Sequence, residues 1–517
     1  MSKKVYKNAT AMLATMLLMS ACGGGSGTGA SASSAPVEGA LLNGPPPRTA
    51  SLTATAFTSA LESSQTGKTL LRFVGAPVCG VDLNYIQYAT VGGAGEATTA
   101  SGVLMVPTGS NPRCTGARPI VLYAHGTAVT KAYNLANFTD TTNEAYSASL
   151  SIAAQFAAQG YIVVAPNYAG YDSSPLAYHP YLNANQQSRD MIDALSAAKT
   201  ALPLVASPST ASSKLFLTGS SQGGYVAMAT ARAMQAAAIP VTASAFVSGP
   251  YAMSAFADTV FYGHVSLGFP VIFEMVATSY QKAYGNMYSS PSDVYESAYA
   301  PGIETLVPGP YTTTTLSTSG KLPATELFSN TPPTGPAALQ PTLDSITPPT
   351  GTGSTDALFA LGFGPNNLVL NSTRLDYLLD ATANPDGAVP TVTTGATAAF
   401  PQSPWRIALK KNDLRGWTPT SPVLLCGGHS DPTVFYETNT GLMAQQWAGL
   451  GSLVTELDVD SPPAGNRFDS ARLYFSSGAA AVAASSGSSA VIEAYHGTLA
   501  NPACMIAATT FFSSYLN

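Results

Sequence analysis

The junction between an apolar run and a glycine-serine pentapeptide constrains the fold more than any other feature of this chain. Residues 214–218 lead into Gly219–Gly223, which has the pattern GxSxG, and an alanine-rich run without proline up to Pro240 follows. This order predicts a strand, a tight turn and a helix. At such a turn the serine is strained, its hydroxyl stands above the sheet, and the next backbone N–H points toward a developing oxyanion. Ser221 is the candidate nucleophile, and a structural serine in a glycine-rich turn is the alternative.

The glycines of this turn have a steric role in the prediction. Gly219 and Gly223 let the strand and helix backbones pass close to the strained serine, and Gly224 gives further room at the start of the helix. The helix that follows consists mostly of good helix formers.

The segments around the turn predict a mostly parallel, doubly wound α/β sheet. Two alternating or β-branched runs, 85–90 and 101–106, read as an antiparallel opening pair. Short, continuously apolar runs are typical of buried parallel strands. Two such runs lie at 119–124 and 161–166, and further strands are expected at 243–248, 422–426 and 454–459. Helices are expected over 145–159 and 185–200, so strands and helices alternate as in a doubly wound sheet.

A long stretch separates two successive strands of the predicted sheet. We expect residues 251–415 to form a cap (lid) domain inserted between a first core part, 51–250, and a second core part, 416–517. A separate accessory domain is the alternative. The first part of the insertion is aromatic and apolar, and residues 301–355, rich in Pro, Thr, Gly and Ser, are expected to be irregular. An aromatic cap would favour apolar acyl groups, although the same residues could form the core of the cap.

The N-terminal residues have the layout of a secretory signal peptide. Three lysines precede the apolar run 11–19, which is too short to span a membrane. Residues Leu18–Cys22 resemble a bacterial lipobox, so we expect a lipoprotein signal peptide over 1–21 and lipidation of Cys22. An ordinary secretory signal is the alternative. Residues 22–50 are expected to be a flexible tether, which predicts a protein secreted across the inner membrane and lipid-anchored at the bacterial outer membrane, cell surface or periplasm.

The charge balance excludes one class of partner. Loss of a signal peptide with three lysines and no acid moves the formal net charge from −6 to −9, and only 10% of residues are charged. Without a basic cluster, nucleic acid is not an expected partner. A small-molecule or lipid ester substrate fits better, with the membrane contacted through the N-terminal lipid anchor.

Cysteine usage predicts disulfides. If Cys22 carries lipid, four of the five cysteines remain, an even number in a compartment where disulfides persist. We expect Cys79 to pair with Cys114 and Cys426 with Cys504, because each pair would join segments that the predicted fold brings together. Free buried thiols are the alternative. No CxxC spacing or His/Cys cluster indicates a metal site.

A serine nucleophile needs a base and an acid that orients the base. In this fold the chain order is Ser, then Asp or Glu, then His. His496, in a short loop before a C-terminal helix, is the candidate base, and Asp431, just past the strand that ends at Cys426, is the candidate acid. Asp458 and Asp460 compete as the acid because they end the next strand and lie closer to His496. His429 precedes the acid, which is the wrong order for a base, so we expect it to line or cap the loop.

Two backbone N–H groups are needed to stabilise an oxyanion. Gln222 follows the nucleophile and supplies the first. Thr127, in the loop after an early strand, is the candidate for the second, with Gly126 allowing a close backbone approach. His125 of the same loop is expected to be structural.

Four motifs together resemble the secretory lipase family of α/β hydrolases. They are YAHGT at 123–127, NYAG at 167–170, HPYL at 179–182 and GSSQGG at 219–224, and the resemblance covers roughly 79–250. It implies an α/β hydrolase fold, a Ser-Asp-His carboxylesterase or lipase with a cap domain, and no cofactor. Asn167 stands where relatives commonly have aspartate, which bears on loop structure because the residue is not part of the triad.

The leading hypothesis is a carboxylic ester hydrolase (esterase or lipase) that acts through an acyl-enzyme. A serine aminopeptidase would use the same triad but would need carboxylates that capture a free amine. Four carboxylates of the insertion are candidates for that role: Glu274, Asp293, Glu296 and Glu304. A catalytically silent lipoprotein that binds a hydrophobic ligand is a third hypothesis, although a binder does not need a nucleophile, base and acid in catalytic order.

Overall fold

The computed structural model describes residues 36–349 and 356–516, and the part from Pro36 onward forms one compact unit. The expected signal peptide over residues 1–21 and the lipidation site Cys22 lie outside the described residues.

A nine-stranded sheet forms the centre of the molecule, in the order β1-β2-β3-β5-β4-β6-β7-β8-β9. The first strands are antiparallel, and β5, β4, β6, β7, β8 and β9 run parallel to one another. The mostly parallel sheet predicted from the sequence is therefore confirmed. The strands are β1 Arg48–Leu52, β2 Gly80–Val91, β3 Ala97–Thr108, β4 Gly116–Ala124, β5 Ile162–Pro166, β6 Ser209–Ser220, β7 Ala243–Val247, β8 Val423–Gly427 and β9 Val454–Asp458.

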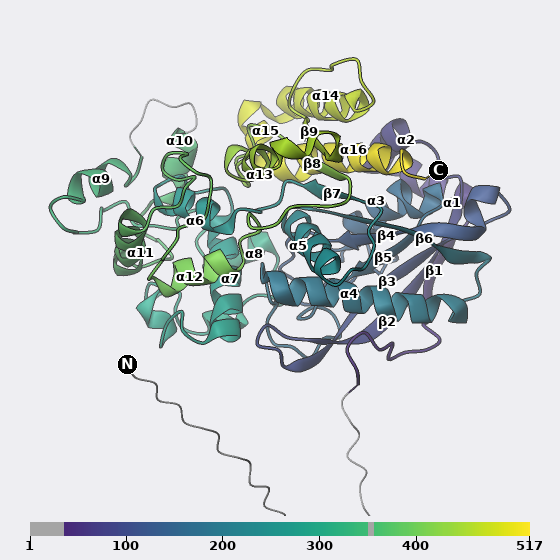
Figure 1. The fold of residues 1–517 in the computed structure, drawn as a ribbon, viewed down its shortest axis with the longest axis horizontal. Coiled ribbons are helices and arrows are strands. Elements are labelled where there is room, and N and C mark those ends of the chain that lie inside the picture. The colour runs from purple at the N-terminus through teal and green to yellow at the C-terminus, as the bar shows by residue number, and fades with distance from the viewer. Residues whose placement is uncertain (1–35, 350–355, 517) are drawn as a thin grey trace, which may run out of the picture. The chain divides into compact units, whose positions relative to one another are not determined.

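Helices cover both faces of this sheet (Figure 1). On one face α4 (Ala184–Ala201) packs beside α5 (Gln222–Ala236), the helix that follows the GxSxG turn. On the other face lie α3 (Tyr146–Gln155) and α16 (Asn501–Ser513). There Phe512 of α16 stacks on Phe216 of β6 with ring centroids 4.7 Å apart. This aromatic contact fixes the helix after the candidate base against the strand that carries the candidate nucleophile.

The tether expected over 22–50 is too long at its C-terminal end. From Gly39 the chain is packed on the core: the Gly39 N–H donates to Ala89 O, Leu41 forms a β-bridge with Tyr88, and β1 pairs with β2. The prolines before β1 favour a tether over a strand. Prolines are nevertheless tolerated at sheet edges, which is where β1 lies. Two helices follow β1, namely α1 (Ala54–Glu62) and α2 (Gln65–Val74).

Between β7 and β8 the chain builds a helical insertion, which gathers at one side of the sheet in Figure 1. Its α-helices are α6 Met253–Phe261, α7 Phe269–Tyr284, α8 Thr313–Thr318, α9 Gln340–Ser345, α10 Asp356–Phe359, α11 Asn371–Ala383 and α12 Pro404–Lys411. The stretch expected to be irregular contains the short helices α8 and α9 between turns. The insertion contacts the core through backbone hydrogen bonds, from Lys131 N to Gly309 O (2.8 Å) and from Leu267 N to Pro432 O (3.3 Å).

The C-terminal part of the sheet carries further helices: α13 Leu442–Gln446, α14 Asp469–Ser486 and α15 Ser488–Ala494. Alanine- and serine-rich residues 479–489, whose composition predicts no particular element, belong mostly to α14. Among the described helices none is long and apolar enough to cross a membrane.

Two disulfides confirm the expected pairing. Cys79 bonds Cys114, and Cys426 of β8 bonds Cys504 of α16. Disulfides of this kind are typical of proteins that fold in oxidising compartments. The second one links the strand before the candidate acid to the helix after the candidate base.

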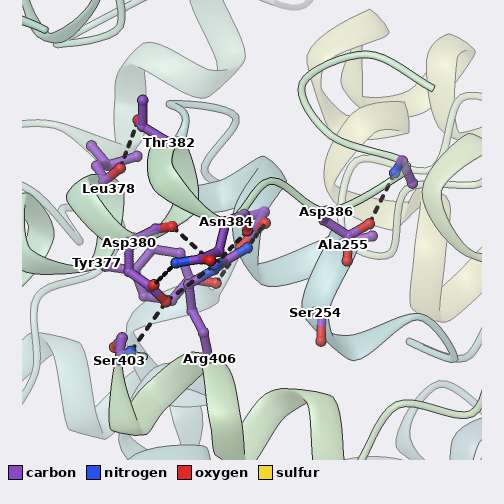
Figure 2. Close-up of polar contacts among 12 residues, drawn as sticks. Ser254, Ala255, Tyr377, Leu378, Asp380, Thr382, Asn384, Asp386, Ser403 and Arg406 are labelled. Atoms are coloured by element: carbon purple, nitrogen blue, oxygen red, sulfur yellow. Dashed lines mark hydrogen bonds and ion pairs between the residues drawn. The ribbon is translucent and has the colours of Figure 1, made fainter. Parts of the chain in front are cut away.

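A buried arginine joins three helices of the insertion. Arg406 of α12 forms an ion pair with Asp258 of α6 at 2.8 Å and another with Asp380 of α11 at 3.1 Å. Figure 2 shows its guanidinium directed at Asp380 and Asn384, and Nη1 also donates to the Asn384 carbonyl at 2.9 Å. The Arg406 side chain is only 2% exposed. A buried charge with this many partners holds the helices in one arrangement, because each group would otherwise be left unpaired away from water.

We predict that Arg406→Ala lowers the free energy of unfolding by about 3–5 kcal/mol, since it leaves two buried carboxylates without their partner. Denaturant unfolding followed by circular dichroism measures this. The matched control is Arg48→Ala, which removes an ion pair with Asp82 whose arginine side chain is 56% exposed and should cost less than about 1 kcal/mol. Equal effects of the two substitutions would contradict the prediction.

Candidate active site

The GxSxG turn has the backbone geometry of a nucleophile elbow. Ser221 has φ 59° and ψ −125°, a conformation that side chains rarely adopt, and its N–H donates to Val247 O at 2.9 Å. A Cβ at Gly219 or Gly223 would overlap the Ala124 carbonyl, and one at Gly224 would overlap that of Val247. The steric role predicted for these glycines is thus observed.

Ser221, His496 and Asp431 lie in one hydrogen-bonded line. His496 Nε2 is 2.9 Å from Ser221 Oγ, and His496 Nδ1 is 2.6 Å from Asp431 Oδ2. The Asp431 side chain is 1% exposed and that of His496 12%. The other carboxylate oxygen of Asp431 accepts the backbone N–H groups of Thr433 and Val434 at 2.9 and 3.1 Å. These bonds hold the carboxylate, and through it the imidazole, in a fixed orientation.

The two competing acids make other contacts. Asp458 accepts from His429 Nδ1 at 2.7 Å and from the His429 N–H at 3.2 Å. Asp460 accepts from the Tyr495 hydroxyl at 2.6 Å. His429 is half exposed, and its hydrogen bond to Asp458 raises its pKa above the ordinary value. The geometry therefore brings Asp431, rather than Asp458 or Asp460, to His496.

His496 lies in a π-helical turn, Tyr495–Ala500, and not in the expected short loop. Its neighbour Tyr495 bridges two loops, because its hydroxyl donates to Asp460 and accepts from the Ser430 N–H at 3.1 Å. Gly428 makes room for this hydroxyl, which would lie 2.5 Å from a Cβ at that position. Tyr495 thus ties the segment bearing the base to the loop bearing the acid. The sequence held no signal for it, since its partners lie 35 and 65 residues away.

The residues expected to form an oxyanion hole lie beside the elbow. Gln222 is the first residue of α5, where N–H groups have no acceptor within the helix. A Cβ on Gly126 would be 3.8 Å from Ser221 Cβ, so the loop that carries Thr127 passes close to the nucleophile. The Thr127 hydroxyl is 2.7 Å from that of Tyr181, and this contact fixes the loop.

Two buried histidines support this region. His125 stacks on Tyr168, and its ring nitrogens lie 2.7 Å from Gly126 O and 3.1 Å from Asn167 O, as expected for a structural residue. His179 Nε2 is 2.7 Å from Gln222 Nε2. Burial lowers the pKa of His125 to about 4 and that of His179 to about 3. A neutral His179 can accept from the Gln222 amide while its Nδ1 donates to Ala169 O at 2.8 Å, a support that the sequence did not reveal.

The four carboxylates considered for amine capture are mostly engaged within the insertion. Asp293 accepts the N–H of Ser290, Glu296 accepts from Asn367, and Glu304 pairs with Lys282 at 3.0 Å. Glu274 of α7 is fully buried and accepts from Thr278 at 3.0 Å. Within the described residues its Oε2 has no hydrogen-bond partner. Burial raises its pKa to about 8.

No group of three His, Cys, Asp or Glu in the part of the chain that the structure describes could hold a metal ion.

Comparison with known proteins yields matches of two kinds. A model of the prolyl oligopeptidase family matches residues 146–258, the part that includes the elbow. The comparison with curated protein sequences finds no match. Among solved structures, the rice cell wall degrading esterase LipA from Xanthomonas oryzae is 26% identical over 89% of this chain and 98% of its own, with a TM-score of 0.62. A protein of Legionella pneumophila is 18% identical over 92% of this chain and 98% of its own, with a TM-score of 0.57, and this match bears on the fold alone.

We predict that Tyr495→Phe slows the reaction of Ser221 with a fluorophosphonate probe about tenfold, because the loss of one charge-assisted hydrogen bond is large enough for a factor of ten. The rate constant of labelling measures this. Tyr299→Phe, which removes an exposed hydroxyl bonded to Asn366 O, is the control and should leave the rate unchanged. If Tyr495→Phe labels as fast as the control, Tyr495 does not position His496.

Glu274 should make stability depend on pH. The folded protein keeps this carboxyl protonated up to about pH 8, whereas an unfolded glutamate releases its proton near its ordinary pKa of about 4.3. The unfolded state therefore binds fewer protons in this window, so stability is lost as pH rises through it. We predict that Glu274→Gln removes a few kcal/mol of this decline in thermal melts across the window. Glu62→Gln, an exposed control on α1, should keep the decline of the unmodified chain.

Proposed function

We propose that this chain, whose fold matches solved esterases of the α/β hydrolase kind, is a serine carboxylic ester hydrolase. The single observation that carries the proposal is the hydrogen-bonded line from Asp431 through His496 to Ser221 Oγ. A base within 2.9 Å of a strained serine, and itself held by a buried carboxylate, is the arrangement that activates a hydroxyl for acyl transfer.

In the proposed mechanism, Ser221 Oγ attacks the ester carbonyl carbon while His496 Nε2 takes its proton. Asp431 holds the imidazole and stabilises its charged form. His496 then gives the proton to the leaving alcohol as the ester C–O bond breaks, which leaves an acyl-enzyme. Water, deprotonated by His496, attacks the acyl-enzyme and releases the acid and Ser221.

The tetrahedral intermediates carry negative charge on the former carbonyl oxygen. The backbone N–H groups of Gln222 and Thr127 are proposed to donate to this oxygen. The His179–Gln222 contact and the Thr127–Tyr181 contact support the proposal, because they fix the two segments before substrate binds. Preorganised donors need no reorientation during the reaction, which is the source of their effect on rate.

The insertion is proposed to act as the cap that binds the acyl group. Two observations support this role. The insertion bonds to the loops that carry Thr127 and Asp431, through Gly309 and Leu267. It also contains a small apolar cavity between α6, α7 and α12, walled by phenylalanines and by Leu182, the neighbour of Tyr181. An apolar lining favours hydrophobic acyl groups.

Lipidation of Cys22 after removal of residues 1–21 is part of the proposal and would place the enzyme outside the inner membrane as a lipoprotein. The sequence Leu18–Cys22 and the two disulfides support it. A shift of the mass of the mature protein by the lipid, absent in Cys22→Ser, would test it.

A serine peptidase is the second candidate, favoured by the match of residues 146–258 to the prolyl oligopeptidase family. The contacts of the insertion weigh against capture of a free amine, because three of its four candidate carboxylates are already bonded within it and Glu274 is enclosed.

The test is hydrolysis of p-nitrophenyl esters from acetate to palmitate by the purified full-length protein, beside an aminoacyl-p-nitroanilide. We expect ester turnover, and we expect Ser221→Ala to lower kcat by at least about 10⁴-fold, as loss of a nucleophile does. Ser196→Ala, at an exposed serine of α4, is the matched control and should keep full activity. The acyl chain length that is hydrolysed fastest would measure the length of the acyl-binding site.

The other outcomes decide between the alternatives. Turnover of the anilide alone would replace the esterase with the peptidase. No turnover of either substrate by a folded protein would favour a ligand-binding lipoprotein.

A further inference from the structure

A second cleft opens beside the nucleophile, on the face of the sheet covered by α3 and α16. Its volume is about 780 Å³, and its walls are the outlying helices α2 and α14. The two walls meet where the Phe73 ring packs edge-on against Tyr474, with centroids 5.3 Å apart. A cleft of this size is in the range of sites that bind small molecules.

The inner end of this cleft adjoins the candidate site on two sides. Ser220, which precedes the nucleophile, lies at one side, and Gly497 and Thr498, which follow His496, lie at the other. The base must give its proton to the leaving alcohol, so the alcohol portion of a bound ester lies on the side of His496. The apolar cavity described above is instead lined by Leu182, whose neighbour Tyr181 contacts Thr127 of the oxyanion loop.

The lining of the cleft combines apolar side chains with polar ones, and the charges that it carries are positive. Among the described residues that line it, Lys68 and Arg72 of α2 are charged and none is a carboxylate, although acids outnumber bases in the whole chain by 28 to 22. Gln155 and Asn501 also line the cleft and are 3% and 8% exposed. Within the structure as described, the side-chain oxygen of each has no hydrogen-bond partner. Buried polar oxygens without partners favour a ligand that brings donors.

We propose that this cleft binds the alcohol portion of the substrate and selects esters of extended polar alcohols that carry a negative charge at their outer end. The inference rests on the proposed ester hydrolase function and extends it to the leaving group. The alcohol runs from the scissile bond past Gly497, between α2 and α14, and ends near Lys68 and Arg72. The acyl group lies in the opposite direction, under the insertion.

Three acetate esters with one acyl group test the proposal. Their alcohols are methanol, a linear triglycerol whose free hydroxyls can donate to the oxygens of Gln155 and Asn501, and the same triglycerol chain ending in a carboxylate. We expect kcat/KM to increase in that order. The acyl site contributes equally to all three, so the ratios report on the alcohol alone.

Two variants and their controls locate the effect. Ser477→Trp places a large ring in the cleft wall on α14. It should lower the ratio of triglycerol-ester to methyl-ester kcat/KM about tenfold, because blocking one binding contact in a pocket changes kcat/KM on this scale. Ser476→Trp adds the same ring to the exposed neighbouring position of α14, outside the lining, and should leave the ratio unchanged.

Lys68→Gln combined with Arg72→Gln should abolish the preference for the charged chain over the neutral one, whereas Lys199→Gln on α4 should not.

Triglycerol esters that are no better than methyl acetate, or ratios that Ser477→Trp leaves unchanged, would overturn the cleft proposal while ester hydrolysis itself stands. A folded protein that hydrolyses none of the acetates, in the preparation in which Ser221 reacts with a fluorophosphonate, would instead overturn the proposed function and the cleft assignment with it.

Discussion

Close backbone contact at the GxSxG turn is the constraint on which the site depends. The carbonyls of Ala124 and Val247 occupy the space that side chains at Gly223 and Gly224 would fill. This proximity lets β6 and α5 meet at a strained Ser221, whose N–H is held by Val247. Strain of this kind persists only where surrounding structure enforces it, and here the two strands beside β6 provide that enforcement.

A second set of contacts fixes the groups that serve this serine. Asp431 is held by two backbone N–H groups, and Tyr495 ties its loop to the π-helical turn of His496. The disulfide between Cys426 and Cys504 joins the strand before the acid to the helix after the base. The segments that carry the acid and the base are therefore joined both by hydrogen bonds and by a disulfide. The alignment with the nucleophile also depends on the aromatic packing that holds α16 on β6.

The central sheet and the main site residues could be predicted from the sequence because they have local signals. Buried parallel strands are short and continuously apolar, and the elbow is a contiguous motif. Edge strand β1 was missed because prolines precede it, and α14 was missed because few of its side chains are buried, which leaves no apolar periodicity to detect. Arg406 and Asp258 are 148 residues apart, and the contact of His179 with Gln222 spans 43. Such contacts form only when distant segments pack together, so no local sequence pattern predicts them.

The line of hydrogen bonds from Ser221 to His496 spans 275 residues of chain. The elbow, the strands beside it and the whole helical insertion must therefore be made before the imidazole exists that can take the serine proton. A nascent chain that has already folded its first six strands presents a serine with no base. Any chemistry that relies on this pair therefore needs the chain beyond residue 495 to be synthesised and packed beside the elbow.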